Sequence, residues 1–203
     1  MRTLAIETAT AACSVALIED GIVVAADHAV VGRGHAERLL PMIAGLPDGG
    51  RCDAILVDVG PGSFTGIRVG VAAAKALGFG WGAAVHGYSS LALLAVMDDA
   101  RDDTVIAIEG GHGEVFIARY GGVPLAGIDA ARSIPFDAAV GSIQIARIVG
   151  NAALRLVEAG VRAEAVDLSP DARAVVRLPP ALASLPPVPF YGRGADAKPM
   201  GTG

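Results

Sequence analysis

The sequence has few aromatic residues, few charged residues and almost no lysine. Aromatic side chains make up 4% of its 203 residues, so a core must be built mainly from Ala, Val, Leu and Ile. Such a composition is typical of helices packed on a parallel or mixed sheet. Because 53% of the residues are hydrophobic and only 18% are charged, intrinsic disorder is excluded. The length allows one large domain or two small ones.

Positive charge is scarce as well. The formal net charge is −5, and Lys75 and Lys198 are the two lysines of the chain. No basic stretch with interleaved aromatic residues occurs in the sequence. A protein that grips nucleic acid by itself normally carries a basic patch, so direct binding to RNA is not expected.

Features of secreted and membrane proteins are also missing. Cys13 and Cys52 have neither metal-ligand nor redox-motif spacing, which suits a reducing cytoplasm. The best apolar run, residues 69–85, is short for a membrane crossing and carries Lys75 near its middle. The first ten residues do not have the pattern of a signal peptide. These absences predict a cytoplasmic protein. The high mean hydropathy of +0.53 then indicates an apolar surface kept for a partner.

The expected elements form two similar halves. The first half reads as strand, strand, strand, helix, strand, helix, strand, helix, at residues 4–6, 13–18, 22–26, 34–46, 54–59, after 60–66, 83–88 and 89–97. The polar stretch 100–103 predicts a boundary between the two halves. After it, the strand–turn–strand plan of the first half is repeated. A strand and a helix follow within 146–160, with Asn151 near the helix cap. These patterns divide the chain into a first lobe, a smaller second lobe and a Pro/Gly-rich extended tail, at 1–103, 104–186 and 187–203.

The stretch "GPGSFTGIRVGVAAAKALGFG", residues 60–80, predicts a tight turn that opens a helix. It is not a nucleotide-binding P-loop, because Lys75 follows the glycines by more than two helical turns. Ser63 or Thr65 would cap the helix, and the exposed backbone N–H groups leave weak anion binding open. Small residues recur every fourth position along the helix, at Gly66, Gly70, Ala74 and Gly78. The close neighbour they admit is either the chain's own sheet or a helix of another protein.

The helix expected at 34–46 carries apolar residues in several directions, at Leu39, Leu40, Met42, Ile43 and Leu46. Such a helix is either fully buried or part of a helix–helix interface with a partner.

Candidate catalytic residues are few. The four histidines, His28, His35, His86 and His112, show no pair spaced for a metal. Ser63 does not have the spacing of a nucleophile elbow. The acidic turns at Glu7 and Glu109 either face a nucleotide and its metal across a cleft or simply close hairpins.

Several motifs occur together in one order along the chain. They are "LAIETATAACSVAL", "GHAERLLPMI", "GPGSFTGIRVGVAAAKAL", "GEVFIARY", "VGNAA" and "PFYGRGADAKP". The sequence resembles the TsaB (YeaZ) family, most densely over residues 1–95. This resemblance implies an α/β, actin/Hsp70-like (ASKHA) fold with two lobes, each built on a β-β-β-α-β-α plan, the second one shortened.

The resemblance also implies a function. Family members are non-catalytic subunits of the complex that forms N6-threonylcarbamoyladenosine at position 37 of ANN-decoding tRNAs. The implied partners are a TsaD-like catalytic subunit and a TsaE-like ATPase, with tRNA bound only through the complex and self-dimers formed by the isolated chain. No intrinsic cofactor is expected, whereas ATP or ADP is expected at the complex interface. The rival reading is an autonomous glycopeptidase-like or ATPase enzyme of the same fold.

This sequence departs from the family and from its catalytic sibling at several positions. The sibling's metal-binding His-x-x-x-His aligns with Gly87 and Leu91, so a metal site and an enzymatic role are not expected. Glu7 stands where relatives have Asp, and Gly111 stands where they have Arg. These changes affect the turns that would face a nucleotide.

Two sets of site residues follow from the motifs. The residues predicted for nucleotide contact are Glu7, Thr8, Thr10 and Gly60. The residues predicted for the partner face are Leu39, Leu40, Ile43, Ile67, Arg68, Gly70, Val71, Ala74 and Lys75. A bulky residue at Gly70 should then weaken the complex more than the monomer. The tail around Tyr191 and Arg193 is expected to dock another subunit.

Overall fold

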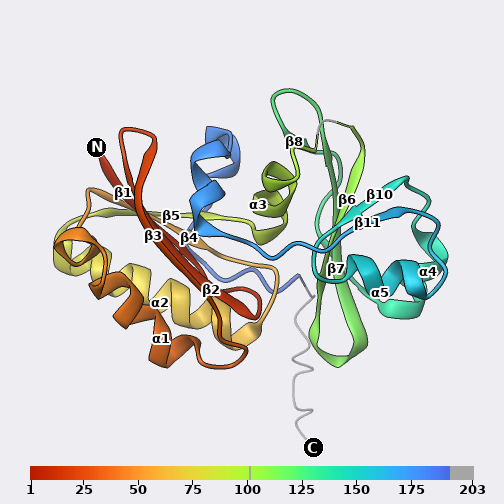
Figure 1. The fold of residues 1–203 in the computed structure, drawn as a ribbon, viewed down its shortest axis with the longest axis horizontal. Coiled ribbons are helices and arrows are strands. Elements are labelled where there is room, and N and C mark those ends of the chain that lie inside the picture. The colour runs from red at the N-terminus through yellow and green to blue at the C-terminus, as the bar shows by residue number, and fades with distance from the viewer. Residues whose placement is uncertain (101, 193–203) are drawn as a thin grey trace, which may run out of the picture.

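Two mixed β-sheets form the frame of the chain, one in each half (Figure 1). The structure is a computed structural model that describes residues 1–100 and 102–192. The first sheet has the strand order β3-β2-β1-β4-β5, and the second has the order β11-β10-β6-β7-β8, with β9 paired to β7. The predicted α/β class and two-lobe plan are confirmed.

The first lobe contains the elements in the order that the sequence predicts. They are β1 (Arg2–Glu7), β2 (Ala12–Glu19), β3 (Ile22–Val30), α1 (His35–Ala44), η1 (Pro47–Gly50), β4 (Ala54–Asp58), α2 (Phe64–Trp81), β5 (Ala84–Tyr88) and α3 (Ser90–Met97). β1 pairs antiparallel with β2 and parallel with β4. The side chains of β1 therefore alternate between two buried faces of a central strand.

The second lobe repeats this plan with shorter outer strands. Its elements are β6 (Thr104–Glu109), η2 (Gly111–Gly113), β7 (Glu114–Gly121), β8 (Ala126–Gly127), β9 (Arg132–Pro135), α4 (Phe136–Ser142), β10 (Arg147–Val149), α5 (Ala153–Glu158) and β11 (Glu164–Val166), after which the chain continues into η3 (Ala172–Arg177) and η4 (Pro180–Leu182). Asn151 lies next to the N-cap of α5, as the sequence predicts. The N-cap residue itself is Ala152, and the Asn151 Oδ1 atom accepts a hydrogen bond from the Glu109 backbone N–H at 2.9 Å. Asn151 thus ties the start of α5 to the end of β6.

The helices and sheets stack as five layers (Figure 1). α1 and α2 cover the outer face of the first sheet, and α4 and α5 cover the outer face of the second. α3 lies between the two sheets, where Ala5 of the first and Ile106 of the second belong to the same apolar cluster. Because both of its sides are covered, seven of its eight residues are buried. Its uniformly apolar sequence, begun by the cap residue Ser89, fits this position.

The chain returns to the first lobe after β11. η3 packs against β1, β2, β3 and α3, and the Ala172 N–H donates to the Ser14 Oγ atom at 2.9 Å. Leu185 then pairs with Gly87 at the edge of the first sheet. The sequence division assigns residues up to 186 to the second lobe, but the segment from Ala172 onward packs on the first.

An ion pair also joins the lobes. Asp98, which caps the end of α3, accepts two hydrogen bonds from Arg147 of β10, at 3.0 and 2.6 Å. The Asp98 side chain is only 5% exposed. This contact fixes the second sheet against the helix between the sheets.

Candidate functional site

The turn that opens α2 is packed directly on the end of β1. Ser63 N–H donates to the Ala9 carbonyl at 2.6 Å, and the Thr8 hydroxyl donates to the Gly66 carbonyl at 2.9 Å. A Cβ atom at Gly66 would overlap the Thr8 carbonyl oxygen. Of the two predicted cap residues, Ser63 is the N-cap of α2: its side chain accepts a hydrogen bond from the Gly66 N–H at 3.2 Å. The turn is therefore a strand-to-helix connection held by the chain itself.

The stripe of small residues along α2 faces the chain's own sheet. A Cβ at Gly70 would collide with the Thr8 hydroxyl, and one at Gly78 would collide with the Val85 side chain. Ala74 is fully buried on the same side of the helix. Between the two neighbours that the sequence left open, the structure selects the internal sheet.

The predicted partner face is largely internal for the same reason. Six of its nine residues are buried in this chain, namely Leu39, Ile43, Ile67, Gly70, Val71 and Ala74. They pack on β1, β2 and β4 in the core under α1 and α2, so they offer no surface to a partner. This corrects the prediction for those six residues, including the expected effect of Gly70.

The other three residues point outward. Leu40 of α1 is 53% exposed, and Arg68 and Lys75 lie on the exposed side of α2. α1 and α2 lie side by side on the outer surface of the first lobe (Figure 1). We define the α1–α2 face by its exposed residues Leu40, Ala44, Arg68, Ala72, Lys75, Ala76 and Phe79. With Phe79 93% exposed, this face is apolar with two cations.

A cleft of about 840 Å³ opens between the lobes. Its walls come from the β1–β2 turn, the first turn of α2 and the β6–β7 turn, and its lining includes Thr10, Arg33, Phe64, Glu109, Gly110, Gly111, His112, Asn151 and Tyr191. Glu109 therefore faces the cleft, where it forms an ion pair with Arg155 at 3.3 Å.

The four residues predicted for nucleotide contact occupy different positions. Thr10 lines the cleft. Glu7 and Thr8 are fully buried below it, and Gly60 is covered by the backbone of Phe190. Glu7, Thr8 and Gly60 therefore offer no surface to a nucleotide in the cleft.

Glu7 belongs instead to a buried carboxyl pair with Asp58 at the ends of β1 and β4. Glu7 Oε1 accepts from the Ala9 N–H at 2.8 Å, and Asp58 Oδ1 accepts from the Gly60 N–H at 2.5 Å. Burial and the neighbouring Asp58 raise the pKa of Glu7 well above its usual value, and burial raises the pKa of Asp58 to about 6. Each carboxyl group therefore keeps its proton to a higher pH than an exposed carboxyl group does.

The Tyr88 hydroxyl closes this pair from the side of β5. It donates to the Ile6 carbonyl at 2.8 Å and lies 3.5 Å from Glu7 Oε2. Asp58 Oδ2 is buried without a hydrogen-bond partner among the described residues. The pair supports the turns at the sheet end and has no access to the cleft.

The histidines belong to different elements, and two of them, His35 and His112, line the cleft. His35 is buried, with Nε2 at 3.1 Å from the Ala12 carbonyl oxygen, and His86 is exposed on β5. Gly87 is covered by Leu185 and Pro186, and Leu91 is buried in the core. In residues 1–100 and 102–192, no three His, Cys, Asp or Glu side chains gather so that they could hold a metal ion.

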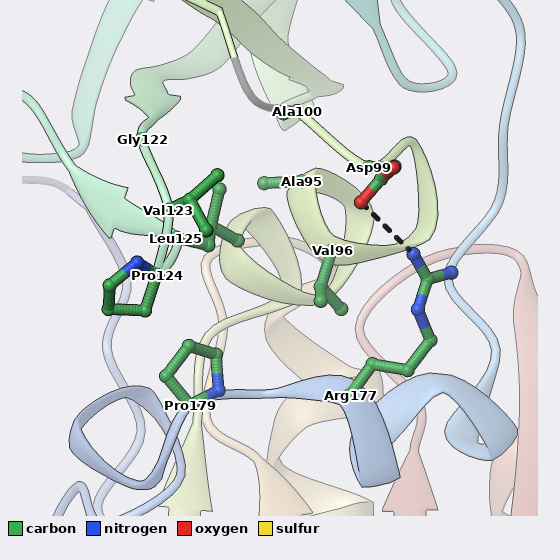
Figure 2. Close-up of a pocket in the computed structure, with 10 residues that line it drawn as sticks. All are labelled: Ala95, Val96, Asp99, Ala100, Gly122, Val123, Pro124, Leu125, Arg177 and Pro179. Carbon is green, nitrogen blue, oxygen red and sulfur yellow. Dashed lines mark ion pairs between the residues drawn. The ribbon is translucent and has the colours of Figure 1, made fainter.

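A smaller hollow lies at the C-terminal end of α3, beside the β7–β8 turn (Figure 2). Its volume is about 240 Å³, and its described lining is apolar apart from Asp99 and Arg177, which form an ion pair at 3.7 Å.

The sequence does not reveal how the C-terminal segment meets α2. Tyr191, predicted to dock another subunit, contacts Phe64 and Arg68 of this chain. The available signal in the sequence was an aromatic residue, Phe64, at the start of the expected helix. Arg193 lies outside the described residues.

None of the helices in the described ranges combines the length and hydropathy that a membrane crossing requires.

Comparisons with known proteins give a consistent group of relatives. Residues 28–166 match the family model described as TsaD, tRNA N6-adenosine threonylcarbamoyltransferase. The chain is 39% identical over 128 residues to the tRNA threonylcarbamoyladenosine biosynthesis protein TsaB of Escherichia coli (strain K12), a match that covers 59% of this chain and 55% of that protein. It is 30% identical over 128 residues to the TsaB protein of Bacillus subtilis (strain 168), with the same two coverages. The chain thus spans little more than half the length of these curated relatives.

Two solved structures share the fold over most of the chain. YeaZ from Pseudomonas aeruginosa is 29% identical with a TM-score of 0.73, covering 87% of this chain and 89% of that one. An uncharacterized protein with similarity to the peptidase YEAZ, also from Pseudomonas aeruginosa, is 26% identical with a TM-score of 0.78, covering 95% and 99%.

Proposed function

Since the chain belongs to the TsaB/YeaZ family and matches the TsaD model over most of its length, we propose that it is a non-catalytic subunit in the formation of N6-threonylcarbamoyladenosine in tRNA. In this proposal it binds and supports a TsaD-like threonylcarbamoyltransferase. The modified nucleotide is position 37 of ANN-decoding tRNAs, which the chain reaches only within the complex in the cytoplasm.

The α1–α2 face is the observation that carries this proposal. Leu40 and Phe79 are large apolar side chains with 53% and 93% exposure, and small alanines lie between them on the outer side of α2. A surface of this kind on neighbouring helices is suited to a helix–helix contact. The buried small-residue stripe holds α2 close to its own sheet, so the outer face is presented by a fixed helix.

Two residues that cannot bind a metal favour a supporting role over catalysis. Gly87 and Leu91 occupy the positions aligned with the catalytic sibling's metal ligands, and neither has a side chain that ligates a metal. Both are enclosed by the chain itself. We propose that ATP or ADP and a TsaE-like ATPase act at the assembled complex, and that isolated chains pair through the same α1–α2 face.

Leu40→Glu tests the proposal in cells. The chain's gene is replaced by the variant in its own organism, and threonylcarbamoyladenosine in total tRNA is measured by mass spectrometry. We expect a loss of at least tenfold, because a carboxylate is placed in an apolar interface. The control is Leu154→Glu, at a leucine of α5 that is 49% exposed on the other lobe, and it should retain the wild-type level. A normal level with Leu40→Glu would contradict the proposed face.

A further inference from the structure

The C-terminal segment holds one arginine of the α1–α2 face in a stack of aromatic rings. The Arg68 guanidinium carbon lies 3.6 Å from the centre of the Phe64 ring and 5.5 Å from the centre of the Tyr191 ring. Arg68 Nε–H donates to the Tyr191 hydroxyl oxygen at 2.8 Å. The two rings are themselves 5.0 Å apart at a tilt of 38°. Arg68 is thus oriented on two sides although it lies at the surface.

The segment that carries Tyr191 is itself anchored to the first lobe. The Phe190 N–H donates to the Val59 carbonyl at 2.7 Å, and Leu185 makes two backbone hydrogen bonds with Gly87, at 2.6 and 2.9 Å. The position of Tyr191 therefore follows from the sheet edge and not from the α2 surface alone. Arg68 is therefore held between Phe64 of its own helix and a segment more than 120 residues later in the chain.

This arrangement leaves the outer edge of the guanidinium available. Among the described residues, no carboxylate lies within 4.0 Å of Arg68, which uses only its Nε–H toward Tyr191. A planar guanidinium binds a carboxylate through two parallel hydrogen bonds, and loses less freedom on binding when its plane is already fixed.

Charge on α2 indicates what such a site would bind. Arg68 and Lys75 are the charged residues of α2, which contains no acidic residue, in a chain of net charge −5. The two cations are separated by roughly 10 Å along the helix, at 1.5 Å per residue, with the apolar Ala72 between them. An acidic group set in an apolar protein surface complements this pattern. A nucleic acid would require a denser row of cations.

We propose that Arg68, oriented by Tyr191 and Phe64, binds a carboxylate of the partner protein at the edge of the α1–α2 face. Tyr191 is then a positioning residue that acts through Arg68. This inference rests on the proposed function, since the partner is the threonylcarbamoyltransferase subunit of the complex.

Calorimetric titration of the full chain with that subunit from the same organism tests the inference. We expect Arg68→Gln to weaken binding about 10- to 100-fold. Arg68→Lys should restore only part of it, because Lys keeps the charge without the planar fork. Tyr191→Phe, which removes only the hydroxyl, should weaken binding roughly threefold to tenfold, in line with loss of one hydrogen bond. Arg162→Gln, at an exposed arginine of the second lobe, removes the same charge and should have no effect.

The double variant distinguishes positioning from an independent contact. Arg68→Gln combined with Tyr191→Phe should bind no more weakly than Arg68→Gln alone, since Tyr191 acts through Arg68. Additive losses would overturn the positioning role. Wild-type affinity of Arg68→Gln would overturn the carboxylate contact while leaving the proposed function intact. If the wild-type chain fails to bind the subunit, the proposed function itself fails.

Transfer RNA serves as the competing probe. Arg68-dependent retention of purified tRNA by the chain alone would overturn the protein partner. We expect no retention of tRNA that depends on Arg68.

Discussion

At the scale of single residues, the buried pair of Glu7 and Asp58 makes the stability of the fold depend on pH. Both carboxyl groups lie at strand ends, and among the described residues no cation contacts them, so burial favours their neutral forms. The backbone N–H groups of Ala9 and Gly60 satisfy only one oxygen of each residue. A shared proton removes one of the two buried charges. The pair therefore holds the first turns together best when protonated.

Stability should fall as pH rises through this pair's titration. The folded pKa of each acid is raised above its unfolded value, so the folded state binds more protons and stability is lost as pH rises through each folded pKa, between about pH 4 and pH 6 for Asp58. For Asp58, the rise from 3.8 to about 6 corresponds to a loss on the order of 3 kcal/mol. Denaturant unfolding between pH 4 and pH 8 measures this loss.

The matched variants for this measurement are Asp58→Asn and Asp167→Asn. Asp58→Asn keeps an oxygen for the Gly60 N–H and should flatten the decline, whereas the exposed Asp167→Asn should leave it unchanged. A stability that rises over the same pH range in the wild-type chain would show that the pair is not buried as described.

At the scale of elements, α2 shows what the sequence could and could not predict. The four-residue spacing of Gly66, Gly70, Ala74 and Gly78 identifies a smooth side of a helix, and the structure has that side. The spacing does not say which neighbour is close, because a sheet and a second helix both require small residues. The contact with Thr8, which follows β1 and is 58 residues away in the chain from Gly66, decides it.

α1 shows the same limit. Leu39, Leu40, Met42 and Ile43 are equally apolar in sequence, yet Leu40 alone among these four is exposed. One helical step of about 100° separates neighbours, so the register of α1 on the sheet decides which leucine is available. The exposed Phe64–Arg68–Tyr191 stack could not be predicted either, because it joins residues distant in sequence.

Two glycines of α2 provide a direct test of this packing. Gly66→Ala should lower the free energy of unfolding by about 1 to 3 kcal/mol, because its new methyl group meets the Thr8 backbone. Gly80→Ala places a methyl group in open space and should raise stability by up to about 1 kcal/mol through helix propensity. Thermal and denaturant unfolding of the two variants measure both effects. Equal tolerance of both substitutions would contradict the internal position of the stripe.

At the scale of the whole molecule, α3 joins the two sheets into one body. Its apolar residues pack on both sheets, the segment from Ala172 returns to the first lobe, and Arg147 binds the nearly buried Asp98. The sequence predicted the two lobes from their repeated strand pattern. It did not predict the returning segment, because short 3₁₀ turns and extended chain leave little periodic signal.

Removing the interlobe ion pair should destabilise the fold as a unit. Arg147→Ala leaves the buried Asp98 carboxylate without its partner, at an expected cost of about 2 to 3 kcal/mol. Arg38→Ala removes an exposed pair with Asp27 at 3.9 Å and should cost under about 1 kcal/mol. Denaturant unfolding with probes in each lobe measures the difference. A selective loss of the second lobe alone would mean that the lobes are not coupled through α3.

We propose that this chain acts by binding a threonylcarbamoyltransferase through the outer surface of α1 and α2. Size-exclusion chromatography with light scattering tests this binding, using the chain alone and mixed with that enzyme from its own organism, with and without ATP. We expect a stoichiometric complex that is stronger than any self-dimer and is lost with Leu40→Glu. If no complex forms and the chain alone hydrolyses ATP or a peptide substrate, the claim is contradicted and an autonomous enzyme becomes the better description.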